Sequence, residues 1–170
     1  MNFRKAEIGD IPKIMEIIRS AQNYLKNEGI DQWQNNYPNS DTIKEDIENV
    51  NSYLIENEKQ IIAAAAIIFE GDPTYNYIED GAWITEAKYG VVHRAAVAEK
   101  YKGQGIMAEI FKETYIMARK KNARSIRIDT HLENFAMQRA IEKENFNYCG
   151  IIYTRGGSKR LAFERIIKSS

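Results

Sequence analysis

A strand-like apolar run, followed by a basic turn with two glycines and then a helical pattern, most constrains what this chain can fold into. The run spans Val91 to Val97, the turn contains Gly103 and Gly105, and the helical pattern continues to about Lys121. Glycine allows positive φ and close approach of the backbone to a ligand, and the first amides of a helix attract anions. This segment predicts either a phosphate-binding turn or a plain start of a helix, and the turn alone does not decide between them.

Length and charge exclude several classes of protein. A chain of 170 residues predicts one domain, over residues 1–170. The 24 basic and 24 acidic side chains cancel, so no overall positive field favours nucleic acid. The longest apolar run, Ile61 to Phe69, is much shorter than the roughly 20 residues that span a membrane. We therefore expect no nucleic-acid partner and no membrane partner.

The cysteine content and the start of the chain bear on compartment and metals. Cys149 is the single cysteine, which excludes an internal disulfide framework and gives no basis for a structural zinc site. Charged residues follow Met1 closely, so the start lacks the apolar region of a signal peptide. We expect a cytoplasmic protein without a metal cofactor.

Apolar periodicity and turn residues predict eleven elements in the order β-α-α-β-β-β-α-β-α-β-β, a mixed sheet with helices on its faces. Asp10 and Asp41 are predicted to cap the first two helices. The predicted helices cover residues 11–29, 41–47, 106–121 and 134–144. The predicted strands cover residues 2–6, 51–56, 60–69, 91–97, 125–130, 146–153 and 160–167.

Two motifs on these elements are similar to those of the GNAT superfamily of N-acetyltransferases. The family pattern Gln/Arg-x-x-Gly-x-Gly/Ala stands here as Lys100-Tyr101-Lys102-Gly103-Gln104-Gly105, with lysine in the first position. A second pattern, Asn-x-x-Ala-x-x-Leu-Tyr-x-Lys-x-Gly-Phe, corresponds to the segment from Asn134 to Phe146, with Asn145 for the usual glycine. The resemblance covers nearly the whole chain. It implies an α/β (α+β) fold with a mixed, mostly antiparallel sheet of six to seven strands and four flanking helices.

The resemblance also implies the cofactor, acetyl-CoA, and the residues that hold it. Backbone amides from Lys102 to Ala108 are expected to wrap the pyrophosphate. Backbone groups of Ala96 and Val97 are expected to face the pantetheine arm, and Asn134 to hydrogen-bond that arm or simply to cap its helix. The expected cofactor residues are Ala96, Val97, Lys102, Gly103, Gln104, Gly105, Ile106, Met107, Ala108 and Asn134.

Acetyl transfer requires a neutral amine, and alkyl amines with a pKa of about 10 are cationic at neutral pH, so a base is useful. His93 is the first candidate, because it lies four residues before Val97 and therefore on the same face of a regular strand. A packed, hydrogen-bonded histidine is the alternative. His131, which follows a predicted strand, is the second candidate, with Asp129 orienting it or acting as a cap.

Ile141 stands where many family members place the tyrosine that protonates the leaving thiolate. Tyr148 and Tyr153 are candidates for this role, with ordinary packing in the sheet as the alternative. Cys149 has no neighbour in the sequence that lowers a thiol pKa, so we expect a buried cysteine and not an acyl carrier.

Aromatic and acidic residues in two irregular segments suit a cationic amine acceptor. The candidates are Trp33, Glu79, Asp80 and Trp83. Aromatics that only hold loops to the core are the alternative.

We therefore predict an acetyltransferase that moves an acetyl group from acetyl-CoA to a primary amine by direct attack in a ternary complex. The acceptor is a small molecule or a peptide. The alternative is a catalytically weak or inactive domain that binds acetyl-CoA as a sensor. Family members often form dimers, so a homodimer is expected from the resemblance alone.

Overall fold

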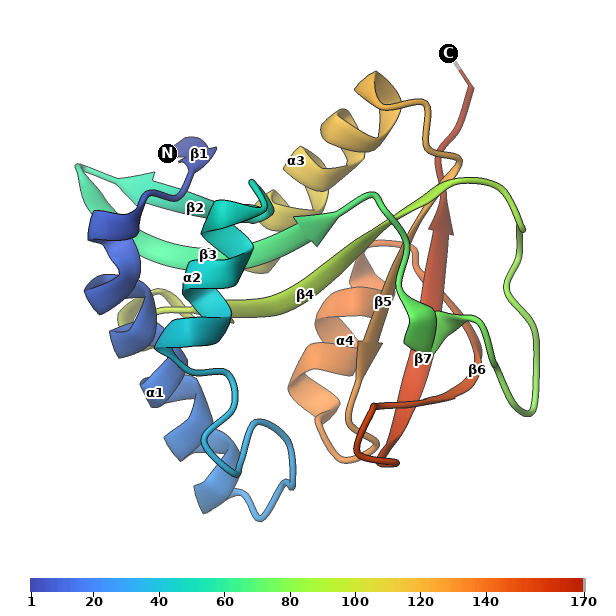
Figure 1. Ribbon diagram of the computed structural model, residues 1–170, viewed down its shortest axis with the longest axis horizontal. Helices are drawn as coiled ribbons and strands as arrows, with labels where there is room; N and C mark the ends of the chain where they lie inside the picture. The colour runs from blue at the N-terminus through green and yellow to red at the C-terminus, as the bar shows by residue number, and fades with distance from the viewer. Residues whose placement is uncertain (170) are drawn as a thin grey trace. The chain divides into compact units, whose positions relative to one another are not determined.

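Seven strands form one mixed sheet in the computed structural model, which describes residues 1–169 (Figure 1). The strands lie in the order β1-β2-β3-β4-β5-β7-β6. β4 and β5 pair in parallel, and the pairs β1–β2, β2–β3, β5–β7 and β6–β7 are antiparallel. The strands are β1 (Asn2–Lys5), β2 (Ser52–Asn57), β3 (Gln60–Ile68), β4 (Tyr89–Val97), β5 (Ser125–Thr130), β6 (Asn147–Tyr153) and β7 (Lys159–Ile166). The predicted mixed, mostly antiparallel sheet is confirmed.

Four α-helices complete the fold in the predicted order. They are α1 (Ile11–Asn27), α2 (Ser40–Glu48), α3 (Ile106–Lys120) and α4 (Phe135–Lys143). Three short 3-10 turns are η1 (Ile8–Asp10), η2 (Pro73–Tyr75) and η3 (Glu99–Tyr101). The predicted ends differ from these bounds by a few residues at most, because apolar periodicity defines a helix better than it defines the last turn.

Contacts divide the chain into two compact units. The first unit comprises residues 1–67 and 94–110, and the second comprises residues 68–93 and 111 onward. The border in β4 falls between His93 and Arg94. The expectation of a single domain over residues 1–170 stays a prediction.

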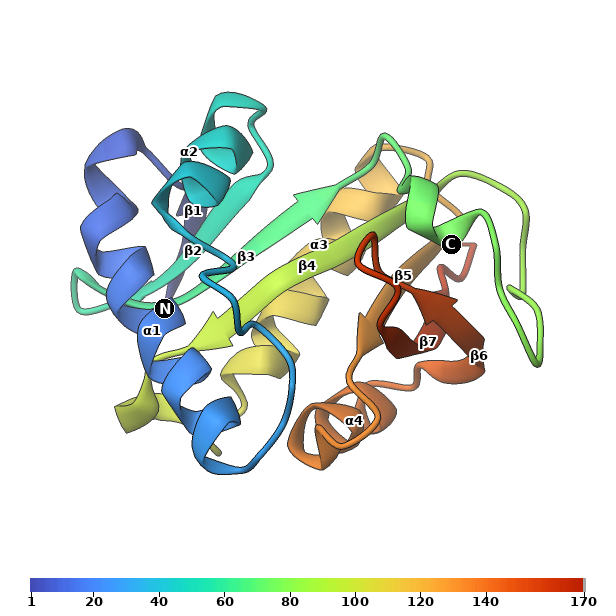
Figure 2. The same cartoon turned by 60° about the horizontal axis from the view of Figure 1, so that its bottom comes forward.

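The core of the first unit lies between helices α1 and α2 and the strands they cover. In Figures 1 and 2 the two helices lie side by side on one face of β2 and β3. The predicted apolar stripe of α1 supplies its fully buried face, and partners come from α2, β2, β3 and β4. The buried residues of this core are Ala6, Ile14, Met15, Ile17, Ile18, Ile43, Leu54, Ala64 and Ala96.

The core of the second unit includes a cluster on η2, β4, β6 and β7. Its buried cluster is Tyr75, Val91, Ile152 and Ala162, with Trp83 and Tyr89 packed against it. The loop from 76 to 88, green at the right of Figure 2, is attached to β6 by two backbone hydrogen bonds of 2.8 Å between Glu79 and Ile151. Gly150 allows this approach, because its φ is +148° and a Cβ there would lie 2.5 Å from the carbonyl oxygen of Glu79.

The predicted cap at Asp41 is wrong, and Asp10 occupies the predicted N-cap position of α1 without making a capping hydrogen bond. Asp10 precedes α1 but makes no side-chain cap, because its carboxylate accepts hydrogen bonds from the Arg4 guanidinium and from the backbone amide of Glu7. Asp41 lies inside the first turn of α2, and Asn39 is the residue whose side chain accepts from the amide of Thr42. At α1 the Arg4 side chain binds the carboxylate of Asp10, and at α2 the Asn39 side chain is the one that caps the helix.

Strand β4 is irregular at Arg94, which has a φ of +49°. A non-glycine residue in the left-handed region within a strand interrupts the two-residue alternation of side chains. His93 and Val97 are expected on one face only in a regular strand, and β4 is not regular through Arg94. The Arg94 guanidinium donates to both carboxylate oxygens of Asp46, at 2.7 and 2.5 Å, and to the hydroxyl of Tyr37.

Within residues 1–169, none of the helices combines the length and the apolar character needed to cross a bilayer.

Candidate active site

The glycine turn lies in the first unit and leads directly into α3. Gly103 and Gly105 have φ values of +74° and +78°, and no atom lies within 4 Å of the position that a Cβ would occupy at either residue. The amide of Glu109 donates to the carbonyl of Gly105 and begins the helical bonding. Amides before that position have no carbonyl one turn earlier in the helix. An open, left-handed backbone leading into a helix has the features needed to approach a phosphate closely.

The lysines of this turn are held locally. The Lys102 ammonium lies 2.6 Å from the Glu99 carboxylate and 4.4 Å from the centre of the Tyr24 ring. The side-chain amide of Gln104 donates to the carbonyl of Lys100. These contacts involve the Lys102 ammonium and the Gln104 side chain within the turn itself.

The other expected cofactor residues take ordinary places in the fold. Ala96 is buried in the core of the first unit, and Val97 is half-buried. Ile106 is buried, and Met107 and Ala108 are half-buried at the start of α3. The capping role of Asn134 is confirmed, because its side chain accepts from the amide of Met137 at the start of α4.

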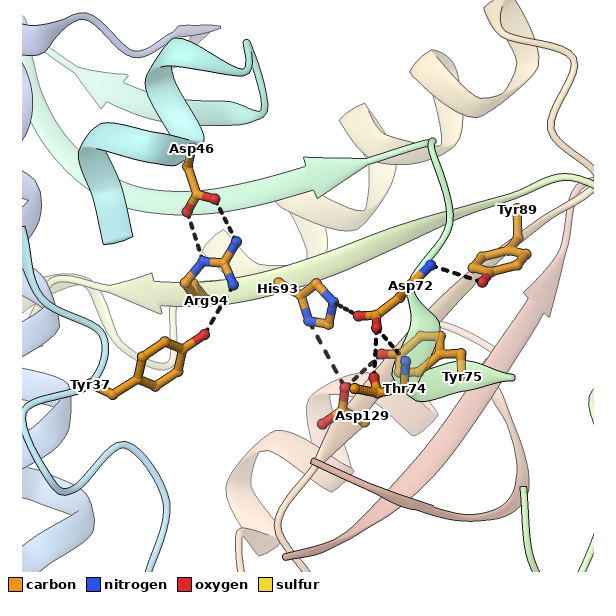
Figure 3. Close-up of polar contacts among 9 residues, drawn as sticks. All are labelled: Tyr37, Asp46, Asp72, Thr74, Tyr75, Tyr89, His93, Arg94 and Asp129. Carbon is orange, nitrogen blue, oxygen red and sulfur yellow. Dashed lines mark hydrogen bonds and ion pairs between the residues drawn. The ribbon is translucent and has the colours of Figure 1, made fainter. Parts of the chain in front are cut away.

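His93 belongs to a polar cluster within the second unit (Figure 3). Its Nε2 lies 2.6 Å from Oδ2 of Asp72, and its Nδ1 lies 4.0 Å from Oδ1 of Asp129. The hydroxyl of Tyr75 donates to that Asp129 oxygen at 2.6 Å. Oδ1 of Asp72 accepts from both the amide and the hydroxyl of Thr74. The side chains of His93, Asp72 and Asp129 are between 15 and 19 % exposed, so the cluster is mostly shielded but still reaches solvent.

The cluster favours an ionised Asp72 beside the imidazole. Burial of Asp72 acts to raise its pKa, but hydrogen bonds from His93 and Thr74 outweigh burial and hold the pKa well below its usual range. Burial raises the pKa of Tyr75 well above its ordinary value, and the neighbouring Asp129 raises it further. Tyr75 therefore keeps its hydroxyl proton and donates a hydrogen bond to Asp129.

The depressed pKa of Asp72 predicts a pH-dependent contribution to stability. A carboxyl group with a lower pKa in the folded state stabilises the fold above its unfolded pKa, about 3.9, and loses that contribution as pH falls through the folded pKa. We expect Asp72→Asn to lower the free energy of unfolding more at pH 5 than at pH 2, measured by urea denaturation. Glu70→Gln, which neutralises an exposed carboxylate in the same segment, is the control. An equal loss at both pH values would contradict this.

The other two catalytic candidates, His131 and Tyr148, make contacts outside the cluster around His93. Nδ1 of His131 accepts a hydrogen bond from the amide of Glu133 at 3.0 Å, and the nearby Asp129 makes its contacts with Tyr75 and His93. Tyr148 is 55 % exposed and touches the edge of Phe163. Their catalytic roles stay predictions.

Three further side chains bear on protonation of the thiolate and on acyl transfer. The hydroxyl of Tyr153 donates to Glu79, and this hydrogen bond raises the pKa of Tyr153 to about 12. Ile141 is fully buried. Cys149 is buried as predicted, and burial raises the pKa of its thiol to about 11, which disfavours a nucleophilic thiolate.

The acceptor candidates do not all lie in one unit. Trp33, in the first unit, packs against the core there. Glu79 accepts from Tyr77 and Tyr153, and hydrogen bonding to Tyr153 lowers its pKa. Asp80 is exposed. The indole of Trp83 donates to the carbonyl of Tyr75, and its ring lies 4.2 Å from the Arg127 guanidinium, so Trp83 serves at least to fix its loop.

Sequence reasoning missed Asp72 as a partner of His93. Asp72 stands in a Gly-Asp-Pro segment, and 21 residues separate it from His93. Its position before proline in a loop is the only local signal, and that signal does not identify a partner. Among residues 1–169, no group of three or more His, Cys, Asp or Glu side chains is arranged to hold a metal ion.

A family model and solved structures of other proteins both match this chain. The model of the acetyltransferase (GNAT) family matches residues 15–146. No curated protein matches the sequence. A GNAT-family acetyltransferase from Streptococcus agalactiae 2603 is 29 % identical with a TM-score of 0.88, and the alignment covers 99 % of this chain and 96 % of that one.

More distant structures share the fold alone. A ribosomal-protein-alanine N-acetyltransferase from Brucella melitensis is 18 % identical with a TM-score of 0.71, over 98 % of this chain and 99 % of that one. An acetyl transferase from Salmonella typhimurium, which modifies the N-terminal serine of ribosomal protein L7/L12, is 17 % identical with a TM-score of 0.69, over 98 % and 94 % of the two chains.

Proposed function

Because the chain belongs to the GNAT family of acetyltransferases, we propose that it transfers the acetyl group of acetyl-CoA to a primary amine by direct attack in a ternary complex. The observation that carries the proposal is the turn at Gly103 and Gly105, whose left-handed, open backbone leads into α3. The turn fits a pyrophosphate, and acetyl-CoA supplies the acyl group as a thioester. We also propose that the chain acts as a single cytoplasmic domain.

Within this function, His93 is the base that removes a proton from the acceptor amine. The amine nitrogen then attacks the thioester carbon, the carbon–nitrogen bond forms, and the carbon–sulfur bond breaks. A free thiol has a pKa of about 8.5, so the departing thiolate is a tolerable leaving group that solvent can protonate. This agrees with an isoleucine at position 141, where no side-chain acid is available.

The acceptor is a small molecule or a peptide. The structural neighbour from Salmonella typhimurium modifies an N-terminal serine, which supports a protein N-terminus as one member of this class. Glu79 and Asp80 are the proposed carboxylates for a cationic acceptor. A homodimer stays an expectation.

Free-thiol release from acetyl-CoA tests the function. The panel contains spermidine, free amino acids, an aminoglycoside, and peptides with N-terminal alanine or serine. We expect at least one amine to release thiol above the rate in water, with the acetylated amine identified by mass spectrometry. If coenzyme A binds but none of these amines is acetylated, the acetyltransferase proposal is wrong.

That outcome would favour the second candidate, a sensor that binds acetyl-CoA without turning it over. The observation that favours it is the fully buried Ile141 in place of the family tyrosine. Binding measured by calorimetry without any thiol release distinguishes the sensor from the enzyme.

The glycine turn makes a separate prediction about cofactor affinity. A left-handed conformation costs a non-glycine residue roughly 1–2 kcal/mol, so alanine at Gly103 and Gly105 favours a different turn. We expect the double variant Gly103→Ala/Gly105→Ala to bind coenzyme A about tenfold more weakly or worse by calorimetry. Gly9→Ala is the matched control, since Gly9 has neither a positive φ nor a neighbour within 4 Å. An unchanged affinity in the double variant would remove the turn from the cofactor site.

A further inference from the structure

The contacts of Asp72 define which nitrogen of His93 carries a hydrogen. An ionised carboxylate can only accept hydrogen bonds. Oδ2 of Asp72 lies 2.6 Å from Nε2 of His93, within hydrogen-bonding distance and at the short end for a charge-assisted hydrogen bond. Nε2 must therefore be the donor. Two hydrogen bonds from Thr74 to Oδ1 fix the carboxylate in this orientation.

The other ring nitrogen has different surroundings. Nδ1 lies 4.0 Å from Oδ1 of Asp129, which is too far for a hydrogen bond. That oxygen already accepts from Tyr75. In a neutral imidazole with its hydrogen on Nε2, the lone pair is on Nδ1 and is not engaged by Asp129.

We propose that Asp72 is a positioning residue for acetyl transfer: it holds the hydrogen of His93 on Nε2, so that Nδ1 is the atom that takes the proton from the acceptor amine. This inference rests on the proposed function. Asp72 does not touch the substrate and acts through His93.

The proton transfer follows from this arrangement. The Nδ1 lone pair takes one proton from the ammonium group of the acceptor, which leaves a neutral amine with a lone pair for attack. Nε2 keeps its hydrogen bond to Asp72, so the ring becomes an imidazolium.

The groups that face the ring are Asp72 from the loop after β3, Asp129 from β5, and Tyr75 from η2, whose ring centre lies 5.8 Å from that of His93. The imidazolium thus forms between two carboxylates, and both stabilise its positive charge. Tyr75 fixes the second carboxylate through its hydroxyl.

The tautomer can be measured in the unaltered chain. The chain has two histidines, so the ¹⁵N signals of His93 are those that disappear in His93→Ala. We expect the neutral ring to show a protonated Nε2 and an unprotonated Nδ1. A ring with its hydrogen on Nδ1 overturns the proposal, and this measurement needs neither an acceptor nor a folded Asp72 variant.

Kinetics then test whether the positioning matters for the reaction. With spermidine or the alanine peptide as the amine, whichever is turned over faster, we expect Asp72→Asn to lower kcat at least about tenfold and to change KM for acetyl-CoA less than about twofold. In a His93→Ala background the same change should cause no further loss, because Asp72 acts through the ring. Glu70→Gln is the matched control for loss of a carboxylate.

An equal fractional loss in both backgrounds would assign Asp72 a structural role alone and overturn the proposal. The two failures are distinguishable. If no amine is acetylated by the unaltered chain, the proposed function fails, while the tautomer of His93 still reports whether Asp72 holds the ring as inferred.

Discussion

Replacement of His93 by alanine is expected to lower kcat for amine acetylation by about 10²- to 10⁴-fold, the range that general base catalysis contributes. A base works in its deprotonated form, so kcat should rise with pH as the catalytic base loses its proton. That rise should disappear in the variant. Initial rates from pH 5.5 to 9.5, with saturating acetyl-CoA and amine, measure both effects.

Cofactor binding separates a catalytic defect from a general one. His93 lies in the second unit and contacts Asp72 and Tyr75, so His93→Ala should keep the affinity for coenzyme A within about twofold. The other histidine provides the comparison, because Nδ1 of His131 accepts a hydrogen bond from Glu133. If His131→Ala flattens the pH–rate profile and His93→Ala does not, the assignment of the base is wrong.

Loss of Glu164 is expected to have the largest effect on stability. Glu164 is fully buried on β7, opposite Arg127 on β5, and its Oε1 accepts from the guanidinium at 3.1 Å. The same carboxylate accepts from the hydroxyl of Ser125 and from the amide of Ile84. Glu164→Leu leaves these donors without an acceptor and the guanidinium without its counterion.

We expect Glu164→Leu to lower the free energy of unfolding by about 3–5 kcal/mol, the usual effect of removing one partner from a buried ion pair. Urea denaturation followed by circular dichroism measures this change. The double variant Arg127→Leu/Glu164→Leu also removes the guanidinium that Glu164→Leu leaves without a counterion. The double variant should therefore be less destabilised than Glu164→Leu alone.

The surface pair between Lys13 and Glu16 is the matched control. Its side chains are 43 and 69 % exposed, so Glu16→Gln should change stability by less than about 1 kcal/mol. If Glu164→Leu loses no more stability than Glu16→Gln, the pair does not hold β5, β7 and the loop of Ile84 together as described.

Two aromatic rings also contact the Arg127 guanidinium in the buried ion pair with Glu164. Its guanidinium lies 4.2 Å from the ring centre of Trp83 and 3.8 Å from that of Tyr89. It also donates to the carbonyl of Thr85. One cation thus joins β4, β5, β7 and the loop before β4, which gives the irregular segment from 76 to 88 a defined place in the second unit.

Local patterns in the sequence determined the order of elements, the strand β5, the glycine turn and the cap at Asn134. Each depends on residues within about one turn or one strand of one another, so periodicity, left-handed glycines and capping side chains are enough to predict it. The family motifs combined the turn with the helix α4 and so identified the acetyltransferase family. The same local reasoning failed at Asp10, where Arg4 competes for the carboxylate that was expected to cap the helix.

Only the tertiary structure decided the partners of the polar side chains. His93 meets Asp72 across 21 residues, Tyr75 meets Asp129 across 54, and Arg127 meets Glu164 across 37. No local periodicity encodes such pairs, because they arise when separate strands and loops are brought together by burial of apolar residues. The left-handed Arg94 within β4 likewise accompanies its contact with Asp46, 48 residues away. The sequence therefore identified His93 as a candidate, and the fold placed the Asp72 carboxylate 2.6 Å from its Nε2.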